Sequence, residues 1–490
     1  MKPNVLLIMV DQMRFDCLSS AGHPIVETPN LDQLAAEGVK FGNAYSATPT
    51  CVPARAAVLT GMSQRSTGRV GYQDRVPWDY PHMLPEEMSH AGYHTQSVGK
   101  MHVYPSRNLC GFHNVILHDG YLHHNRFKNT PYQESFEQTD DYLPWLRERL
   151  GGHRDITDIG LDCNASGMSR PWHLPEEFHP TNWVVTQSID FLRRRDPRKP
   201  FFLKMSFVRP HPPFDPPPAY FDYYMSKEID EPVIGTWAAN DEEGLGLLPT
   251  TRRGVVPEQR LKRARAAYYA LIAHLDDQIG RFLQAMIEYQ VYQNTVILFV
   301  SDHGELLGDH HFLAKSLAYE GSAKIPFILS DPGNQLGIQK GTTCDKIIEL
   351  RDIMPTLLEA AHAPIPETVE GKSVIPLAKG MEIEWRPYLH GEHSFGDLSH
   401  HYIVNGKEKY IWYSQTGIEQ YFDLVNDPKE IYNLSQDHRY SERVAYLRNI
   451  LVQELEGREE GYSDGAQLIV GCQPKAVLNN REKMRGLKRS

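Results

Sequence analysis

Cys51 begins a short segment, Cys-Val-Pro-Ala-Arg, that brings a nucleophile and a cation within about one helical turn of each other. Pro53 near the start and Gly61 just past the end predict a short helix that begins near Cys51. The N-terminus of a helix favours an anion, because its backbone N–H groups are unpaired and its dipole is positive there. Arg55 adds a cation, so the segment predicts a site for a tetrahedral oxyanion at Cys51. The alternative is a buried structural cysteine at a helix start.

Polar side chains also follow four short apolar runs of the chain. The runs cover residues 5–10, 95–98, 201–207 and 295–300, and the side chains after them belong to Asp11, Gln12, Lys100, His102, His211, Asp302 and His303. In a parallel α/β sheet, ligands bind beyond the carboxyl ends of the strands. Each residue alone has an ordinary explanation, such as a helix cap, a surface pair or a core histidine. Four such strand ends together predict one polar site.

Part of this set is suited to a metal ion. Asp11, Gln12, Asp302 and His303 offer carboxylate and amide oxygens together with one imidazole. Oxygen ligands suit a hard divalent cation, and the imidazole leaves Mn²⁺, Fe²⁺ or Zn²⁺ open as well.

The remaining residues could bind or protonate an anion. Lys100 and His102 are two residues apart, so on a continuing strand they face the same side of the sheet. His211 lies between prolines, which fix the backbone and hold the imidazole in one direction. Lys315 follows His303 by a dozen residues and is a further candidate, with Lys324 as a competing choice.

The elements that would position these residues alternate along the first two-thirds of the chain. Apolar runs are separated by helical patterns, for example at residues 31–37 and 263–287. This alternation predicts the α/β class, with a mostly parallel central sheet flanked by helices. Residues 104–182 lack periodicity and are too long for a simple loop. We interpret them as an insertion over one rim of the sheet, which either determines substrate selectivity or is irregular surface structure.

The pattern changes near residue 366, so we expect a catalytic domain over residues 1–365 and a smaller α+β subdomain with a tail over residues 366–490. Residues 402–404, 409–413 and 420–424 are typical of short strands, and residues 442–455 are typical of a helix. They predict a small antiparallel sheet with a helix packed on it. The basic tail after Pro474 is expected to be a solvated terminus.

The composition is ordinary for a globular protein and excludes several classes. The 490 residues carry 51 Lys and Arg against 62 Asp and Glu, a formal net charge of −11, which argues against a nucleic-acid partner. The six cysteines include no Cys-x-x-Cys pair and do not suggest a disulfide framework. Without a stretch typical of a transmembrane helix or a signal peptide, we expect a cytoplasmic protein without membrane contact. A mature chain trimmed of a leader would instead be periplasmic or secreted.

Taken in order, these motifs resemble the formylglycine-dependent sulfatases of the alkaline phosphatase superfamily, which include arylsulfatases and are related to phosphonate monoester hydrolases. The Cys-x-Pro-x-Arg signature is highly specific, and the resemblance covers nearly the whole chain. Besides the Cys51 segment and the strand that leads into Asp11, it rests on residues 99–102, 210–212, 301–304, 352–357, 370–373, 421–428 and 433–434. It implies an alkaline phosphatase-like fold.

By this resemblance, a separate sulfatase-maturing (formylglycine-generating) enzyme converts Cys51 to formylglycine, whose hydrate is the nucleophile. The family also implies one divalent metal ion, calcium being the first choice and Mn, Fe, Zn or Mg the alternatives. Its implied ligands are Asp11, Gln12, Cys51, Asp302 and His303.

The resemblance also implies roles for the cations and histidines. Arg55, Lys100 and Lys315 would neutralise the sulfuryl oxygens. His211 or Lys315 would protonate the departing alkoxide, and His102 would accept the proton of the second hydroxyl so that sulfate is expelled.

Two residues depart from the common sulfatase pattern. Many sulfatases carry a second Asp in place of Gln12 and often an Asn in place of His303, and the pair seen here resembles phosphonate monoester and phosphodiester hydrolases and some glycan sulfatases. The leading prediction is hydrolysis of a sulfate monoester of a carbohydrate or aryl alcohol, as a small molecule or a glycan. Its rival is phosphonate monoester or phosphodiester hydrolysis at the same site, and a third reading is an anion-binding protein that is never matured. The sequence allows a homo-oligomer without specifying one.

Overall fold

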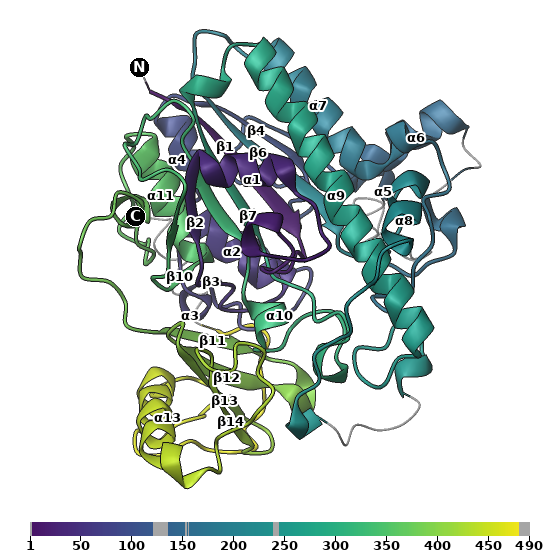
Figure 1. Cartoon of the computed structure of the whole chain (residues 1–490). Helices are drawn as coiled ribbons and strands as arrows, with labels where there is room; N and C mark the ends of the chain where they lie inside the picture. The colour runs from purple at the N-terminus through teal and green to yellow at the C-terminus, as the bar shows by residue number, and fades with distance from the viewer. Residues whose placement is uncertain (1, 121–135, 152–153, 155, 239–244, 480–490) are drawn as a thin grey trace.

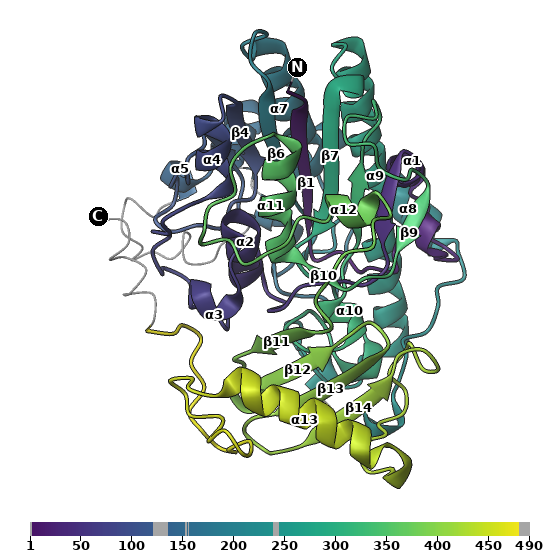
Figure 2. The same cartoon turned by 90° about the vertical axis from the view of Figure 1, so that its left-hand side faces the viewer.

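The computed structural model describes residues 2–120, 136–151, 154, 156–238 and 245–479. Within these residues, the chain forms an eight-stranded sheet covered by helices on both faces and a separate four-stranded sheet that lies beneath it in Figure 1 and Figure 2. No helix of the described part is both long and apolar enough to cross a membrane. All six cysteines are described, and each is free.

The four apolar runs predicted as strands form the centre of the large sheet. They are the adjacent parallel strands β4 (His94–Gly99), β6 (Phe201–Pro210), β1 (Asn4–Asp11) and β7 (Thr295–Ser301). β5 (Asn114–Leu117) lies beside β4, and beyond β7 follow β8 (Phe327–Ser330), β2 (Gly38–Phe41) and β9 (Thr342–Cys344). Because β8 runs antiparallel to both of its neighbours, the sheet is mostly but not wholly parallel. The predicted fold class is confirmed.

Both faces of this sheet are buried, because side chains alternate along each strand. In β1, Leu6 and Ile8 face one apolar core, and Leu7 and Met9 face the other. The first core is closed by α1 (Pro29–Ala36), α7 (Pro180–Arg194), α8 (Pro218–Met225) and α9 (Glu258–Glu288). The second is closed by α2 (Cys51–Thr60), α4 (Leu84–His90), α11 (Ile353–Ala360) and α12 (Ile375–Ala378). The predicted helices at residues 31–37 and 263–287 correspond to α1 and α9.

The small sheet is an antiparallel meander with one helix on it. Its strands are β11 (Leu389–His393), β12 (His400–Val404), β13 (Glu408–Tyr413) and β14 (Glu419–Asp423), and α13 (Ser441–Leu455) packs on one face (Figure 2). β12, β13, β14 and α13 coincide with the predicted elements, whereas β11 was not predicted. The division of the chain at residue 365 stays a prediction; α12, which follows that residue, packs in the second core of the large sheet.

Two segments expected to be irregular contain defined structure within the described residues. The expected insertion at residues 104–182 contributes β5 at the sheet edge and α6 (Tyr142–Leu150), while its residues 121–135, 152–153 and 155 lie outside the described residues. The expectation of a solvated tail is wrong for residues 475–479. The carbonyl of Ala476 accepts hydrogen bonds from Val70 and Gly71 at 3.1 Å each, and the buried Leu478 donates its N–H to the carbonyl of Gly68 at 2.8 Å, because the backbone here pairs with residues 68–71. Residues 480–490 of the tail lie outside the described residues.

Candidate active site

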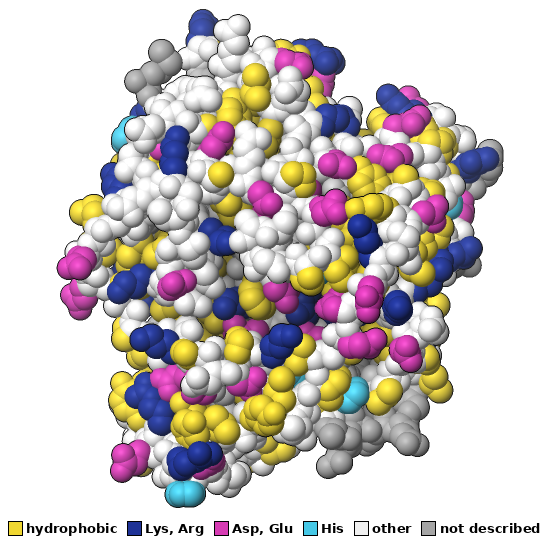
Figure 3. Space-filling model, viewed as in Figure 1, with side chains coloured by type: hydrophobic (Ala, Val, Ile, Leu, Met, Phe, Trp, Pro, Cys, Tyr) yellow, Lys and Arg dark blue, Asp and Glu magenta, His cyan; other side chains and the backbone are white. Residues whose placement is uncertain are grey.

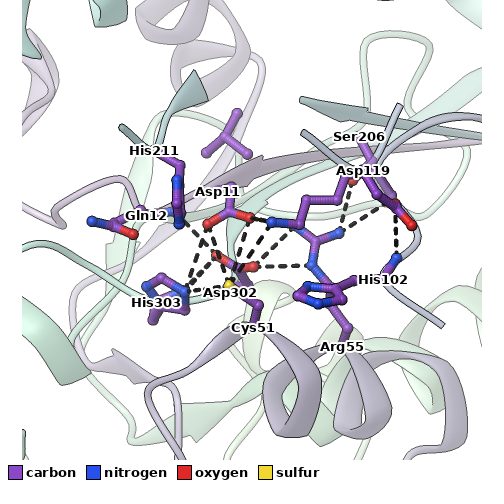
Figure 4. A network of polar contacts seen from close by, with 12 residues as sticks. Asp11, Gln12, Cys51, Arg55, His102, Asp119, Ser206, His211, Asp302 and His303 are labelled. Atoms are coloured by element: carbon purple, nitrogen blue, oxygen red, sulfur yellow. Dashed lines mark hydrogen bonds and ion pairs between the residues drawn. The ribbon is translucent and has the colours of Figure 1, made fainter. Parts of the chain in front are cut away.

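The carboxyl ends of the four central strands meet at the first turn of α2, as Figure 4 shows. Asp11 ends β1 and Gln12 follows it, while β4, β6 and β7 lead into Lys100 and His102, into His211, and into Asp302 and His303. The helix begins at Cys51 and stops at Gly61, whose φ of 66° is the left-handed conformation that favours glycine after a helix. The structure thus brings the sequence-predicted residues to one edge of the sheet.

Cys51 lies at the centre of this group and is only 2% exposed. Its Sγ is 3.2 Å from His303 Nε2, 3.3 Å from Lys315 Nζ and 3.7 Å from both carboxylate oxygens of Asp11. Burial and Asp11 act to raise the pKa of the Cys51 thiol, but Lys100, Lys315 and His303 outweigh them and hold it well below its usual range. Position 51 is therefore a place where negative charge is stabilised.

Four residues around this point could hold a metal ion. Asp11, Cys51, Asp302 and His303 each present a ligand atom, and these atoms lie within 4.8 Å of one another. His303 Nδ1 is 3.0 Å from the carbonyl of Gly304, so that nitrogen carries a proton and Nε2 faces the cluster. Two carboxylates and one imidazole fit a divalent ion, which would bind Nε2 in place of a proton.

Gln12 contributes its amide oxygen to the same side of the site. Its Nε2 donates to Glu305, which fixes the orientation of the amide, and its Oε1 accepts from Lys315 Nζ at 2.7 Å. The backbone of Gln12 has a φ of 70°, and its N–H is held by Asp302 Oδ1 at 3.1 Å. Such left-handed backbone in a residue other than glycine is costly and is concentrated at functional sites. Glu305 was not singled out in the sequence.

The structure distinguishes between Lys315 and Lys324, the two candidates for the lysine of the site. Lys315 lies beside the Cys51 sulfur, whereas Lys324 pairs with Glu320 at 3.2 Å. Lys100 forms an ion pair of 2.6 Å with Asp11 Oδ2. Lys100 and Lys315 are therefore the two lysines that the structure places at the site.

Arg55 lies deeper, with 1% of its surface exposed. Its Nε donates to Asp302 Oδ2 at 3.1 Å, and one terminal nitrogen donates to Asp11 Oδ2 at 3.3 Å and forms an ion pair of 2.9 Å with Asp302 Oδ2. The other terminal nitrogen donates to the carbonyl of Lys100 and the hydroxyl of Ser206, both at 3.0 Å. All three nitrogens of the guanidinium thus have partners within the protein. We therefore favour a role for Arg55 in holding the carboxylates of Asp11 and Asp302, rather than the predicted contact with a sulfuryl oxygen.

His102 is oriented by two carboxylates. Its Nε2 is 3.2 Å from Asp74 Oδ1, and the second oxygen of Asp74 accepts the Tyr72 hydroxyl at 2.6 Å. Its backbone N–H donates to Asp119 Oδ1 at 2.9 Å. Burial acts to lower the pKa of His102, but hydrogen bonding to Asp74 and Cys51 raises it to about 9.

His211 is held differently. Its Nδ1 lies 2.8 Å from the carbonyl of Pro212, and burial, followed by the charge of Lys315, holds the pKa of His211 well below its usual range. The ring is therefore neutral at pH 7.

A cavity of about 490 Å³ opens beside Cys51. Besides Lys100, His102, His211 and Lys315, it is lined by residues that the sequence analysis missed, among them Tyr72, Asp74, Arg252, His393, Ser394 and Phe395. These residues lie in loops and at the end of β11, where no predicted apolar run precedes them. The one signal available was that Asp74 follows the Cys51 helix closely in the sequence. Asp119, Cys163 and Asn164 of the expected insertion also line the cavity, and a role of that segment in selectivity stays a prediction.

The sequence of the chain is similar to those of known sulfatases. A model of the sulfatase family matches residues 3–363, and a model described as N-sulphoglucosamine sulphohydrolase, C-terminal, matches residues 308–457. An arylsulfatase of Clostridium perfringens (strain 13 / Type A) is 58% identical over 472 residues, which are 96% of this chain and 98% of that protein.

Solved structures share the fold. The phosphonate monoester hydrolase of Agrobacterium radiobacter superposes with a TM-score of 0.73 at 27% identity and covers 92% of this chain and 95% of its own. A structure determined with its substrate D-glucosamine-2-N,6-O-disulfate has a TM-score of 0.73 at 19% identity and covers 93% and 98%. The match to the family model and the identity to the arylsulfatase extend over most of the chain, so it belongs to the sulfatase family of the alkaline phosphatase superfamily and is a sulfuric ester hydrolase.

Proposed function

We propose that this chain hydrolyses a sulfate monoester of a carbohydrate or an aryl alcohol, with formylglycine made from Cys51 as the nucleophile. The position of Cys51 gives the strongest support. It is the first residue of α2, its sulfur lies 3.3 Å from Lys315 Nζ and 4.0 Å from Lys100 Nζ, and it borders the cavity. An oxyanion at this point meets a nucleophile, a helix N-terminus and two cations together.

One divalent metal ion fits the cluster formed by Asp11, Asp302, His303 and residue 51, with Gln12 Oε1 as a further donor. When bound, the ion would polarise the sulfuryl oxygens and the nucleophilic hydroxyl. Calcium is our first choice because most of the donors are oxygens; the imidazole keeps Mn, Fe and Zn as alternatives, and Mg is a further one. Elemental analysis of the purified protein tests this, with Asp302→Asn expected to lose the metal.

The residues of the chain would hold the substrate and move its protons. Hydrated formylglycine supplies two hydroxyls on one carbon: one attacks sulfur, and the other allows sulfate to be expelled as the aldehyde returns. Lys100 and Lys315 hold the sulfuryl oxygens. His102 accepts the proton of the second hydroxyl. Because His211 is neutral at pH 7, we favour Lys315 as the proton donor to the departing alkoxide.

Phosphonate monoester or phosphodiester hydrolysis is a second candidate. It is supported by the presence of Gln12 and His303 in the metal-binding cluster and by the similarity to the phosphonate monoester hydrolase at 27% identity. Values of kcat/KM on 4-nitrophenyl sulfate and on a 4-nitrophenyl phenylphosphonate, measured with the same metal, separate the two. We expect the sulfate to be the better substrate; phosphonate turnover far above sulfate turnover would contradict the proposal.

Maturation is tested by intact-protein mass spectrometry on the chain from its native host or after co-expression with a formylglycine-generating enzyme. We expect the mass of formylglycine at residue 51 together with sulfate ester turnover, and neither in Cys51→Ala, which should remain folded. Full turnover by a protein from the native host that carries an unmodified Cys51 thiol would contradict the mechanism.

A further inference from the structure

We propose that Arg252, His393 and Ser394 form a second anion subsite in the active-site cavity, so that preferred substrates carry a carboxylate or a further sulfate on the alcohol part. This inference rests on the proposed function, because it concerns the alcohol that leaves the same cavity. It names the substrate class as sulfate esters with at least two negative groups.

Arg252 is the cation of this subsite. It lines the cavity and is an exposed residue, and its guanidinium carbon lies 5.5 Å from the centre of the Phe395 ring. The other cations of the described cavity wall are engaged: Lys100 pairs with Asp11, Lys315 donates to Gln12, and His102 pairs with Asp74. None of the ion pairs among the described residues includes Arg252. An unpaired guanidinium on an aromatic ring is well suited to a carboxylate or sulfate, which can accept two parallel N–H groups.

His393 is an independent sign of a ligand. It is the last residue of β11 and 2% exposed, it lines the same cavity, and within the described structure neither of its ring nitrogens has a hydrogen-bond partner. Buried polar atoms in proteins are nearly always paired. Burial, then the charges of His400 and Arg252, hold the pKa of His393 well below its usual range, so its ring is neutral and has one N–H to donate. Ser394, next in the chain, adds a hydroxyl to the wall.

The distribution of charged side chains around the cavity favours binding of an anion at the wall formed by Arg252, His393 and Ser394. The described lining of the cavity includes two carboxylates, Asp74 and Asp119, and both are engaged around His102. The wall of Arg252, His393 and Ser394 has no carboxylate among the described lining residues. On the face of the molecule in Figure 3, by contrast, acidic and basic side chains are interspersed. A second negative group on the substrate would therefore be held by Arg252.

Binding of non-hydrolysable sulfonates to the full-length, metal-loaded protein tests the proposal, because a CH₂–SO₃⁻ group replaces the O–SO₃⁻ group of the substrate. The probes are phenylmethanesulfonate, its 3- and 4-carboxylate derivatives and the matching disulfonates, measured by calorimetry. We expect at least one dianionic probe to bind about tenfold more tightly than the monoanion. If the carboxylate derivatives bind more tightly than the disulfonates, the preferred second group is a carboxylate. If the disulfonates bind more tightly, it is a sulfate. The preference should be lost in Arg252→Gln and kept in Arg253→Gln, since Arg253 does not line the cavity.

Equal binding of all probes to the wild-type protein, or an unchanged preference in Arg252→Gln, would overturn the subsite. Binding does not require formylglycine, so the outcome is separate from turnover. If no sulfate ester is turned over but dianionic probes still bind more tightly in an Arg252-dependent way, the proposed reaction is wrong and the subsite stands. If aryl sulfates are turned over but dianionic probes bind no more tightly than the monoanion, the reaction stands and the subsite is wrong.

Discussion

At the scale of single residues, the site depends on charges buried beneath the cavity. Arg55 is the cation shared by Asp11 and Asp302. Removing one partner of a buried ion pair leaves an uncompensated charge and costs about 3–5 kcal/mol. We therefore expect Arg55→Ala to lower the free energy of unfolding by this amount, as well as to lose activity. Urea unfolding followed by circular dichroism measures the first effect and sulfate ester turnover the second.

The matched control is Arg65→Ala in α3 (Gln64–Thr67), where the arginine is exposed and replacement should change the free energy of unfolding by less than about 0.5 kcal/mol. If Arg55→Ala unfolds at the same urea concentration as the wild type, Arg55 is not needed to hold the two carboxylates.

His102 carries a prediction about pH. Its pKa is raised to about 9, because hydrogen bonding to Asp74 and Cys51 outweighs burial. Below that value the ring is mostly protonated and cannot accept a proton, so the step that needs neutral His102 becomes faster as the pH rises. Asp74→Asn removes the charge that stabilises the protonated ring, and the rising limb of the kcat profile should move to lower pH. We also expect kcat to fall about tenfold or more, because the ring loses its orienting partner.

The measurement is kcat against pH from neutral to alkaline conditions, with Asp397→Asn, an exposed carboxylate, as the control that should leave the profile in place. A rising limb at the same pH in Asp74→Asn would show that Asp74 does not set the protonation of His102.

At the scale of elements, the four central strands of the large sheet were predictable, whereas β2, β5, β8 and β9 were not, and the small sheet was predictable in part. β1, β4, β6, β7 and the start of α2 follow from local patterns, namely apolar runs and a proline–glycine pair around a helix. β11 has the sequence Leu-His-Gly-Glu-His, which has no apolar run, and its burial depends on partners far along the chain. The same reason applies to three residues of the cavity, Asp74, Arg252 and His393. Long-range packing places them there, and no local sequence pattern predicts it.

The long-range partner of β11 is Arg458, which donates to both oxygens of Glu392 at 2.8 and 2.7 Å. Burial acts to raise the pKa of Glu392, but Arg458 outweighs it and lowers it to about 2, from an ordinary 4.5. A depressed pKa gives a stabilisation that is complete above pH 4.5 and is lost as the pH falls towards 2. Arg458→Ala should destabilise β11 and β12 by about 3–5 kcal/mol at neutral pH, as measured by hydrogen exchange of their amides.

Acid weakens the same strands in the wild type, so the difference between wild type and Arg458→Ala should shrink as the pH falls from 4.5 towards 2. Arg439→Ala, which removes an exposed pair with Asp437, serves as the control and should leave the exchange of β11 unchanged. Equal protection of β11 in Arg458→Ala and the wild type would contradict the role of this pair.

At the scale of the whole molecule, the two sheets share an apolar core. Tyr45 and Tyr319 from the large unit pack in one cluster with Tyr402, Ile411 and Phe422 from the small sheet. A chain that ends at residue 365 would expose this surface and would also lose α12 from the second core. We expect such a chain to be insoluble or aggregated when expressed alone, as judged by size-exclusion chromatography.

Co-expression of residues 366–490 as a separate chain should increase the soluble fraction, since it restores the missing half of the core. A soluble, monodisperse fragment of residues 1–365 that hydrolyses sulfate esters would show that the larger unit is independent of the shared core.

The enclosure of Cys51 has a consequence for the timing of the proposed maturation. His303 and Lys315, which contact its sulfur, follow it in the chain by 252 and 264 residues. At about 5–20 residues per second, they leave the ribosome on the order of ten seconds to a minute after Cys51 does. If Cys51 is matured as proposed, the maturation enzyme would reach the thiol during that interval, because the residue is 2% exposed in the finished fold. The fraction of chains that carry formylglycine would then depend on the speed of translation, and slower elongation between codons 51 and 315 would raise it.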